Sequence, residues 1–435
     1  MDNPNGSKRY CIIGAGAAGL AVAKNFQQRG IPFDVFDRHE DVGGLWGFKR
    51  PYSAVYESAR LISSKPMTQF QDFPMPADLP DYPGQRAVLD YFKSYAEHFD
   101  LRRHIRFNTE ITQTTRNGED WEVELADGSK RQYGGLVVAS GITWDPNYPD
   151  IPGEFSGKTL HSVEYKTAQQ LSGKKVLVIG GGNSGCDIAA EVGRQAKSTF
   201  LSVRRGYHFI PRYVFGIPTD QFGEFSIKMG TPLWARQWLN QMIVKLVLGN
   251  PVKLGFPKPE HRILESHPIV NAEVLEDIRQ GRVVAKSDVS GFDGCKVLFN
   301  DHSQEEIDVV IFATGYKLSF PYLHSSHLNG PEGAPNFYLH IFHPEYNNLF
   351  ITGMIQPDSG VWRLMDDQAA LISAYIGAQR DNHEVADRFN ILKSGSQPNL
   401  SGGIRYVNSV RHHTEVEHSS YRRILAEHLV KLRPS

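Results

Sequence analysis

Short runs of apolar residues alternate along the chain with glycine-rich turns and helical patterns. Residues 10–13 (Tyr-Cys-Ile-Ile) form one such run, and residues 176–179 (Val-Leu-Val-Ile) form another. Continuous apolar runs of this length are typical of strands buried on both faces of a parallel sheet. Each run is followed by a glycine-rich turn and an alanine-rich helical pattern. The pattern therefore predicts two strand–turn–helix units, the repeating element of an α/β fold.

Each unit continues with a hairpin and then a closing apolar strand. The segments are residues 121–125, 127–128 and 138–141 in the first unit, and residues 296–299, 300–301 and 309–315 in the second. Asp-Gly and Asn-Asp pairs between strand patterns are typical hairpin turns. The repetition predicts one architecture used twice, a parallel sheet that carries a β-meander.

The order of these segments predicts that one domain is inserted into the other. Residues 145–157 form a Pro/Gly-rich connector between the units, as expected at a domain boundary. After residue 315 the chain has material for a strand at 349–352 and a helix at 367–379. We therefore expect residues 1–165 to begin the first domain, 166–315 to form the second with a helical insertion near 215–267, and 316–435 to return to the first domain with C-terminal helices.

Both turns carry the glycine spacing of a dinucleotide-binding site. The first is Gly14-Ala-Gly16-Ala17-Ala18-Gly19, and the second is Gly180-Gly-Gly182-Asn183-Ser184-Gly185. In this fingerprint the first glycine allows the tight turn, the second lets the backbone approach a pyrophosphate, and the third packs the helix on the strand. The helix N-terminus then stabilises the phosphates.

The residues about 20 positions further on differ in charge. Asp37, followed by Arg38, ends the strand pattern after the first fingerprint, whereas Arg204 and Arg205 end the one after the second. A carboxylate accepts hydrogen bonds from a ribose 2′-hydroxyl and repels a 2′-phosphate, and an arginine does the opposite. The sequence predicts FAD or NAD at the first site and NADPH at the second.

Composition narrows the class of protein. The 435 residues contain 47 Lys and Arg against 48 Asp and Glu, so no strong field favours nucleic acid or an anionic membrane. No apolar run is long enough to span a bilayer, and the first strand begins too early to leave room for a targeting peptide. Three cysteines without a C-x-x-C pair, and 17 histidines without ligand spacing, indicate neither a disulfide reductase nor a metal site. We expect a cytoplasmic protein.

The connector contains Phe155-Ser-Gly157-Lys-Thr-Leu-His161-Ser-Val-Glu-Tyr165. This segment matches F-x-G-x-x-x-H-x-x-x-[Y/F], and the chain resembles the flavin-containing monooxygenases that carry this signature. The resemblance extends in order over nearly the whole chain up to about residue 360. Its other motifs are Gly43-Gly44-Leu45-Trp46, Lys65-Pro-Met67, Asp72-Phe-Pro-Met-Pro76 and Ala313-Thr314-Gly315-Tyr316.

The resemblance implies which cofactor each site holds. It places FAD at the first site, with contacts from Gly14, Gly16, Ala17, Ala18, Gly19, Asp37, Arg38, Gly44, Leu45, Trp46, Thr314 and Gln356. It places NADPH at the second site, with contacts from Gly180, Gly182, Asn183, Ser184, Gly185, Arg204, Arg205, His161 and Tyr165.

The resemblance also implies the chemistry. In enzymes of this kind, such as those similar to N,N-dimethylaniline monooxygenase, NADPH reduces the flavin. The reduced flavin traps O₂ as a C4a-hydroperoxide, which transfers one oxygen atom to the nitrogen or sulfur of a small amine or sulfide. The protein positions the cofactors and excludes water. The helical pattern at 234–247 either covers the active site or forms a homodimer contact.

One departure from the family pattern leaves alternatives open. Family members commonly carry Asn near the flavin where this chain has Ile62, which donates no hydrogen bond. Ser63 or Ser64 then supplies the donor, or the NADP⁺ amide stabilises the peroxide, or the protein is an uncoupled NADPH oxidase or flavin reductase. Baeyer–Villiger oxygenation of ketones is a further alternative, disfavoured because relatives with that activity carry Trp at the position of Tyr165. A non-catalytic NADPH-binding sensor is a third alternative.

Overall fold

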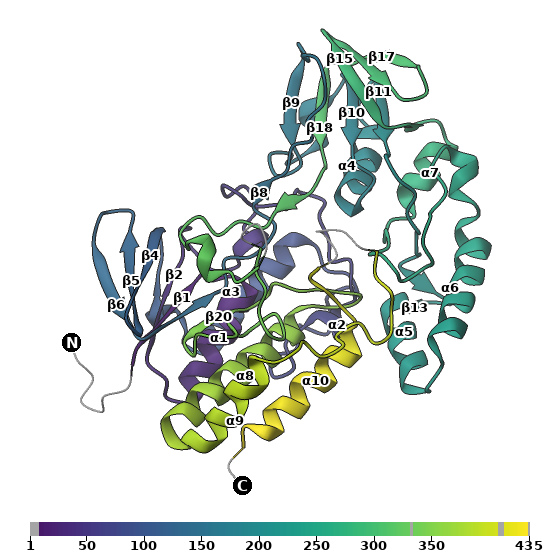
Figure 1. The fold of residues 1–435 in the computed structure, drawn as a ribbon. Coiled ribbons are helices and arrows are strands. Elements are labelled where there is room, and N and C mark those ends of the chain that lie inside the picture. Colours follow the sequence, from purple (N-terminus) through teal and green to yellow (C-terminus); the bar gives the residue numbers. More distant parts are fainter. Residues whose placement is uncertain (1–7, 331–333, 408–412, 434–435) are drawn as a thin grey trace.

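The computed structural model describes residues 8–330, 334–407 and 413–433, and it is built around two parallel sheets (Figure 1). The first sheet has the strand order β20-β7-β1-β2-β3, and each neighbouring pair is parallel. Its strands are β1 (Tyr10–Ile13), β2 (Phe33–Phe36), β3 (Ile105–Arg106), β7 (Gly135–Val138) and β20 (Leu349–Ile351).

The second sheet has the order β14-β11-β10-β18-β9 and is also parallel throughout. Its strands are β9 (Lys158–His161), β10 (Lys175–Ile179), β11 (Ser198–Ser202), β14 (Val284–Lys286) and β18 (Val309–Phe312). All of them lie in sequence between β7 and β20 of the first sheet. The predicted fold class, two nested α/β units, is therefore confirmed.

Each sheet carries an antiparallel meander on one face and helices on the other. The meanders are β4 (Ile111–Asn117), β5 (Asp120–Leu125) and β6 (Lys130–Tyr133) in the first unit, and β15 (Val289–Asp293), β16 (Lys296–Phe299) and β17 (Gln304–Glu306) in the second. Because successive side chains of a strand point to opposite faces, Tyr10 and Ile12 join the core on the helical side, whereas Cys11 and Ile13 join the core with the meander. This two-sided burial explains the continuous apolar runs.

Helices from both ends of the chain cover the first sheet (Figure 1). They include α1 (Ala17–Gln28), α3 (Gln85–His98), α8 (Trp362–Asp381), α9 (His383–Lys393) and α10 (His418–Lys431). Helix α1 packs on α8, and α8 packs on α9 and α10. In the second unit α4 (Asn183–Gly193) packs on α7 (Glu273–Arg279). The helix expected at 367–379 thus begins earlier, at Trp362.

The two crossings between the units lie side by side. Strand β8 (Asp145–Pro146), on the outgoing crossing, pairs antiparallel with β19 (Tyr316–Lys317) on the returning one. Strand β9, at residues 158–161, pairs with β18 of the second sheet, and the domain boundaries expected at residues 165 and 315 stay predictions.

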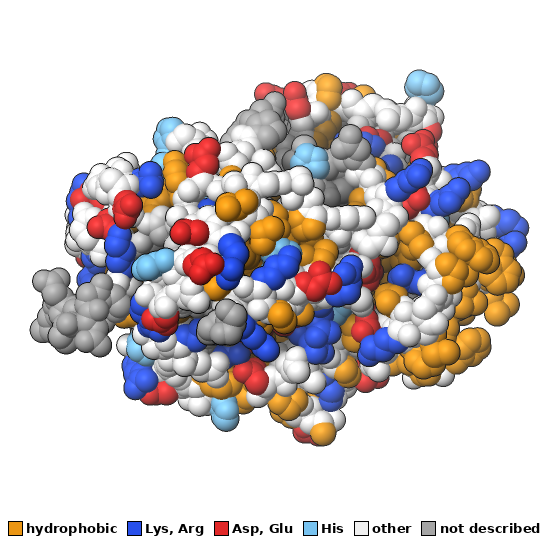
Figure 2. All heavy atoms as spheres, turned by 60° about the horizontal axis from the view of Figure 1, so that its bottom comes forward, with side chains coloured by type: hydrophobic (Ala, Val, Ile, Leu, Met, Phe, Trp, Pro, Cys, Tyr) orange, Lys and Arg blue, Asp and Glu red, His pale blue; other side chains and the backbone are white. Residues whose placement is uncertain are grey.

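The insertion in the second unit contains β12 (Tyr213–Val214), β13 (Ile217–Pro218), α5 (Thr219–Lys228) and α6 (Leu233–Leu248). Several large apolar side chains on it are exposed, including Phe225, Trp234, Trp238 and Leu246. Figure 2 shows hydrophobic side chains gathered at the right of the view, the side on which Figure 1 places α5 and α6. No helix in the described part of the chain is long and apolar enough to cross a membrane.

Candidate active site

The first glycine turn leaves no space for side chains. Gly14 has φ +107°, and a Cβ built there would lie 2.6 Å from the carbonyl oxygen of Ala139. A Cβ on Gly19 would lie 1.8 Å from the carbonyl oxygen of Gly14. Helix α1 starts at the Gly16 cap without a side-chain hydrogen bond. Its first backbone N–H groups are therefore available to phosphate oxygens.

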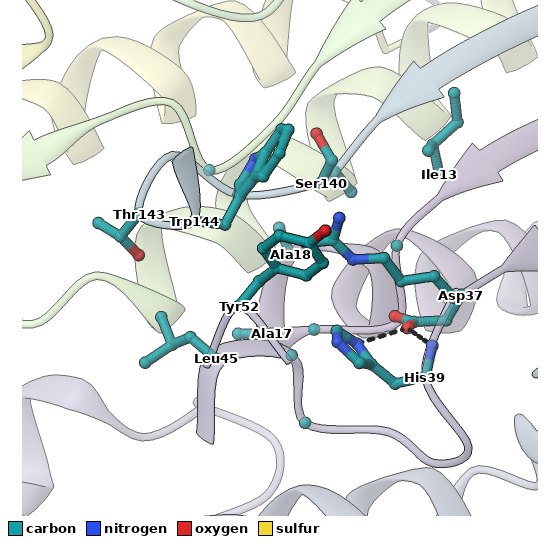
Figure 3. A pocket seen from close by; sticks show the side chains of 18 of the residues that line it. Ile13, Ala17, Ala18, Asp37, His39, Leu45, Tyr52, Ser140, Thr143 and Trp144 are labelled. Carbon is teal, nitrogen blue, oxygen red and sulfur yellow. Dashed lines mark hydrogen bonds and ion pairs between the residues drawn. The ribbon is translucent and has the colours of Figure 1, made fainter. Parts of the chain in front are cut away.

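A cavity of about 440 Å³ opens in front of this turn. Its walls come from the glycine turn and from segments far apart in sequence (Figure 3). The lining includes Gly14, Gly16, Ala17, Ala18, Asp37, Arg38, His39, Gly44, Leu45, Trp46, Tyr52, Ser140, Trp144, Tyr322, Thr352, Gly353, Val361 and Trp362. The cavity lies at the carboxyl ends of parallel strands, where α/β folds bind their ligands.

Asp37 is held in its ionised form at one end of the cavity. The backbone N–H of Ala15 donates to Asp37 Oδ2 at 2.7 Å, and that of His39 donates to Oδ1 at 2.8 Å. His39 Nδ1 lies 3.0 Å from the same Oδ1 (Figure 3). Burial alone would raise the pKa of Asp37, but these hydrogen bonds outweigh it and lower the pKa. The result is a fixed acceptor of the kind that binds ribose hydroxyls.

Arg38 lies against two aromatic rings beside Asp37. Its guanidinium carbon is 4.1 Å from the ring centre of Tyr52 and 4.9 Å from that of Trp144. The two rings meet edge to face at 6.1 Å (Figure 3). The sequence did not single out Tyr52 or Trp144. For Trp144 the available signal was its place just after a parallel strand, at the edge of the sheet where ligands bind.

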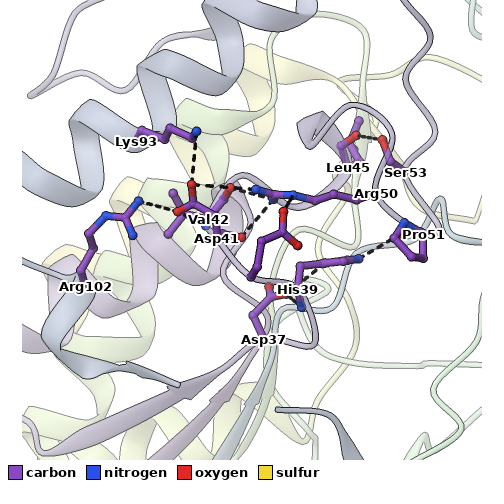
Figure 4. Close-up of polar contacts among 11 residues, drawn as sticks. Asp37, His39, Asp41, Val42, Leu45, Arg50, Pro51, Ser53, Lys93 and Arg102 are labelled. Atoms are coloured by element: carbon purple, nitrogen blue, oxygen red, sulfur yellow. Dashed lines mark hydrogen bonds and ion pairs between the residues drawn. The ribbon is translucent and has the colours of Figure 1, made fainter. Parts of the chain in front are cut away.

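The Gly43–Trp46 loop is held in place by a buried arginine (Figure 4). Arg50 Nη1 donates to the carbonyl oxygens of Asp41 and Val42, both at 3.0 Å, and Arg50 Nε donates to Glu40 at 2.8 Å. The Asp41 carboxylate in turn contacts Arg102 and, at 3.2 Å, Lys93. Gly44 approaches Gly16 so closely that a Cβ on Gly44 would lie 3.0 Å from the Gly16 Cα.

The far end of the cavity is aromatic. The rings of Trp46 and Trp362 meet edge to face at 6.3 Å, and both residues line the cavity. Two further residues expected at FAD lie elsewhere: Thr314 donates to the carbonyl oxygen of Asn147 at 2.5 Å between the crossings, and Gln356 pairs with Thr414 through its backbone N–H and its side chain. Neither is among the lining residues, and their contact with FAD stays a prediction.

The second glycine turn repeats the geometry of the first. A Cβ on Gly180 would lie 2.3 Å from the carbonyl oxygen of Ala313, and one on Gly185 would lie 1.8 Å from that of Gly180. A Cβ on Gly182, by contrast, would meet nothing within 4 Å, which is the open approach that a pyrophosphate needs. Ser184 follows on α4, and Asn183 accepts from the Val270 N–H at 2.8 Å, just after the insertion.

The two arginines after β11 differ in their surroundings. Arg204 is exposed, whereas Arg205 is half-buried and donates to the Tyr207 hydroxyl at 3.2 Å. Arg204 is therefore the guanidinium more available to a 2′-phosphate.

His161 and Tyr165 are buried rather than directed at an open site. His161 Nε2 lies 3.1 Å from the Gly315 carbonyl oxygen, and its Nδ1 accepts from the Val163 N–H at 3.2 Å. Burial lowers the pKa of His161, which keeps the ring neutral. Tyr165 packs in the core of the second unit, 5.8 Å from the ring of Tyr56. These contacts position the connector, and direct contact of either residue with NADPH stays a prediction.

Ile62 and Ser63 line a second cavity of about 110 Å³, and Ser64 lies beside it. The Ser63 hydroxyl is 2.7 Å from that of Thr68. Ser64 is fully buried, and its N–H donates to Asp220 of α5 at 2.6 Å. The two cavities adjoin at one turn, because Asp358 and Ser359 line the second while Val361 and Trp362 line the first.

The two sheets, each with a glycine turn and a meander, define a protein with two dinucleotide-binding domains. The chain belongs to the flavin-binding monooxygenase-like family, which it matches over residues 7–379. Flavin-containing monooxygenase 5 of Oryctolagus cuniculus is 33% identical over 453 residues, covering 98% of this chain and 84% of that protein. The N-oxide-forming dimethylaniline monooxygenase 2 of the same organism is 33% identical over 389 residues, covering 83% of this chain and 72% of that protein.

Solved structures show the same fold. Cyclohexanone monooxygenase from Rhodococcus sp. Phi1, bound to NADP⁺, has a TM-score of 0.69 at 20% identity, with 97% of each chain covered. S-allyl-L-cysteine S-oxygenase from Allium sativum has a TM-score of 0.65 at 20% identity, covering 97% of this chain and 88% of that one. By its family, the protein is an FAD-dependent NADPH monooxygenase.

The first cavity fits FAD. The cavity offers three features in turn: an acceptor for the ribose, a glycine turn at a helix N-terminus, and an aromatic far end. When bound, FAD supplies redox chemistry and the activation of O₂ that amino acid side chains lack. Among residues 8–330, 334–407 and 413–433, no group of three or more His, Cys, Asp or Glu is arranged to hold a metal ion.

Proposed function

We propose that this monooxygenase oxygenates the nitrogen or sulfur of small soft nucleophiles rather than ketones. The observation that carries this proposal is the charge of the second cavity, whose described lining includes Asp220, Glu224, Asp358, Glu415 and Glu417 but only one guanidinium, that of Arg236. Ketone oxygenation needs an anionic, nucleophilic oxidant, whereas heteroatom oxygenation needs a neutral, electrophilic one. Neighbouring carboxylates destabilise an anion, so they favour the second reaction.

The proposal assigns roles to this chain's own residues. Asp37 binds the FAD ribose, the N-terminus of α1 binds the pyrophosphate, and Trp46 and Trp362 enclose the ring end. The N-terminus of α4 binds the NADPH pyrophosphate, and Arg204 binds the 2′-phosphate. Ile62 and Ser63 form the flavin-side wall of the substrate cavity, and Ser64 lies behind it. The names of two similar proteins, an N-oxide-forming monooxygenase and an S-oxygenase, agree with this substrate class.

The experiment compares three substrates in the FAD-loaded enzyme with NADPH and O₂. Methyl p-tolyl sulfide, N,N-dimethylbenzylamine and cyclohexanone are supplied separately, and products, NADPH and hydrogen peroxide are quantified. We expect sulfoxide and N-oxide, with little lactone. Lactone as the main product would instead establish ketone oxygenation, and peroxide equal to the NADPH consumed with every substrate would establish an oxidase.

We further propose a cytoplasmic protein that forms a homodimer through the exposed apolar side chains of α5 and α6 (Figure 2). Exposed apolar patches of this kind commonly mark interaction surfaces. Sedimentation should show a dimer for the natural chain and a monomer for Trp238→Glu. A monomer for both would contradict this assignment.

A further inference from the structure

The second cavity contains polar groups that the oxygenation chemistry does not use. His418, at the start of α10, is 3% exposed and lines the cavity. Neither of its ring nitrogens has a hydrogen-bond partner among the described residues, and the same holds there for the Tyr406 hydroxyl and the Ser359 hydroxyl. Buried polar groups are nearly always satisfied in native proteins. These unpartnered groups therefore point to a ligand that completes their hydrogen bonds.

The charges around the cavity determine the sign of the charge on that ligand. The Asp358 carboxylate accepts a hydrogen bond from the His418 backbone N–H at 2.9 Å. Glu417 accepts from the N–H groups of Ser419 and Ser420, at 3.2 and 2.8 Å. Asp220 accepts from the N–H groups of Ser64 and Gln221. These are interactions with neutral dipoles, which leave the negative charges themselves uncompensated.

Cationic side chains of the described residues compensate part of this charge. Lys228 Nζ lies 3.5 Å from Glu224, which also accepts from the Ser419 hydroxyl at 2.7 Å. Arg236 of α6 lines the cavity. Arg422 of α10 is already paired with Asp367, at 3.3 Å.

Burial decides the protonation of two titrating groups at the cavity. His418 does not add a positive charge at neutral pH, because burial, helped by Arg422 and Arg363, lowers its pKa to about 4. Burial and the neighbouring Glu417 raise the pKa of Asp358 to about 6. A raised carboxyl pKa is expected where carboxylates crowd without enough cations.

We propose that the second cavity binds a protonated amine on the substrate, remote from the sulfur or nitrogen that is oxygenated. The ammonium group donates hydrogen bonds to Asp358 and to the neutral His418 ring, and the soft atom faces the wall of Ile62 and Ser63. An ammonium has three donors and no acceptor, which suits this set of acceptors. The substrate is thus a small aminoalkyl sulfide or a diamine. This inference rests on the proposed function.

The first test uses a pair of substrates matched in shape. One is the cationic sulfide 2-(methylsulfanyl)ethylamine, and the other is 2-(methylsulfanyl)ethanol, which has the same sulfide and no charge. Their kcat/KM values are measured with the FAD-loaded enzyme and NADPH. We expect the cationic sulfide to be preferred by roughly tenfold or more, the scale of one charged hydrogen bond. Equal kcat/KM values for the two sulfides would overturn the cation site while leaving the monooxygenase proposal intact.

Two variants change the charge of the cavity in opposite directions. Asp358→Asn keeps an oxygen that accepts from the His418 N–H, and it should lower the ratio of the two kcat/KM values about tenfold. Arg236→Gln removes the positive charge and should raise the ratio. Asp293→Asn serves as the control, because Asp293 is exposed on β15 in the distant meander. If Asp358→Asn and Arg236→Gln shift the ratio in the same direction, the proposal is contradicted.

A binding measurement separates this inference from the oxygenation reaction. Propylammonium chloride and 1-propanol are titrated calorimetrically into the FAD-loaded protein without NADPH. We expect heat of binding for propylammonium only, and weaker binding in Asp358→Asn. If propylammonium binds but no sulfide is oxygenated, the cation site stands and the proposed function fails. If sulfides are oxygenated but propylammonium does not bind, the proposed function stands and the cation site fails.

Discussion

At the scale of single residues, the site is built by side chains whose charge is fixed before any cofactor arrives. Asp37 already accepts hydrogen bonds from Ala15 and His39, so its carboxylate is oriented in advance. Arg204 is exposed and Arg205 is tied to Tyr207. The sequence identified both charges from their distance to the glycine turns, but their different surroundings come from the tertiary structure.

Arg204→Ala should weaken NADPH selectively. The lost charge-assisted hydrogen bond is worth about 1.5–3 kcal/mol, or roughly 10- to 150-fold in KM. Steady-state KM values for NADPH and NADH check this, and only the first should rise. Arg205→Ala is the matched control, with a smaller effect expected. Equal losses for both nucleotides would refute the 2′-phosphate assignment.

Ile62→Asn should tighten the coupling of NADPH oxidation to product. Ile62 is 37% exposed on the second cavity, so an amide there can donate a hydrogen bond into the cavity that we propose as the oxygenation site. One such bond contributes about 0.5–1.5 kcal/mol, so hydrogen peroxide release per NADPH should fall roughly two- to tenfold. Ile62→Leu, which adds no donor, should leave the peroxide yield as it is. A higher yield in Ile62→Asn would argue against a missing donor.

At the scale of elements, loops around the cofactor depend on buried polar side chains. Arg50 holds the Gly43–Trp46 loop by two carbonyl oxygens and Glu40. Lys393 of α9 plays a similar part elsewhere, donating to the carbonyl oxygens of His343, Pro344 and Tyr346. Such side chains let irregular backbone lie in the interior.

Arg50→Met should weaken FAD binding more than it disturbs the fold. It leaves the carbonyl oxygens of Asp41 and Val42 without their donor, which costs about 1–3 kcal/mol for a buried group. We expect the FAD dissociation constant to increase roughly tenfold. It is measured by flavin fluorescence when FAD is titrated into the apoprotein. Arg50→Lys should be intermediate, because it keeps the charge but not the planar fork. FAD affinity equal to that of the natural chain in Arg50→Met would show that the loop orders itself.

His343 should make the protein less stable in acid. Its ring is 2% exposed, and Nδ1 accepts from the N–H groups of Glu345 and Tyr346 at 3.1 and 2.9 Å. Burial lowers its pKa to about 4, below the unfolded value near 6.5. The unfolded chain therefore binds the proton first, and stability present above pH 6.5 is lost as the pH falls toward 4.

The measurement is the free energy of unfolding at pH 7.5 and pH 5.0. His343 alone should lower it by about 2 kcal/mol between these values. His343→Asn keeps an acceptor for the same turn without titrating, so its free energy of unfolding should change less. If the free energy of unfolding of His343→Asn depends on pH as strongly as that of the natural chain, the acid sensitivity comes from other residues.

At the scale of the whole molecule, the two domains are joined by more than their covalent crossings. The segment at residues 53–82 of the first unit contacts the second: Tyr56 donates to Asp187 on α4 at 2.6 Å, and Tyr82 donates to the Arg212 carbonyl oxygen at 2.6 Å. Burial raises the pKa of Asp187, while Tyr56 and Asn271 oppose this. Helix α4 is thereby fixed to the loop of the first unit that carries Tyr56.

Tyr56→Phe should loosen the contact between the domains. It removes a hydrogen bond to a buried carboxylate, worth about 1.5–3 kcal/mol, so the melting temperature of this chain of 435 residues should fall by roughly 2–3 °C. Tyr213→Phe is the control, because its bond to Asp81 is exposed and contributes little. A melting temperature unchanged in Tyr56→Phe would mean that Asp187 is satisfied by Asn271 alone.

The sequence by itself determined the two buried strands with their glycine turns, the nesting of the two units and the opposite charges that follow β2 and β11. The strands, turns and charges can be recognised in segments of about 20 residues, because periodicity and turn chemistry are local properties. It did not determine which side chains meet. Tyr52, Trp144 and Trp362 join the FAD cavity from separate segments, and Asp220, Asp358 and His418 join the second cavity from three. Only the packing of distant elements brings them together, so the lining of both cavities is decided by the tertiary structure.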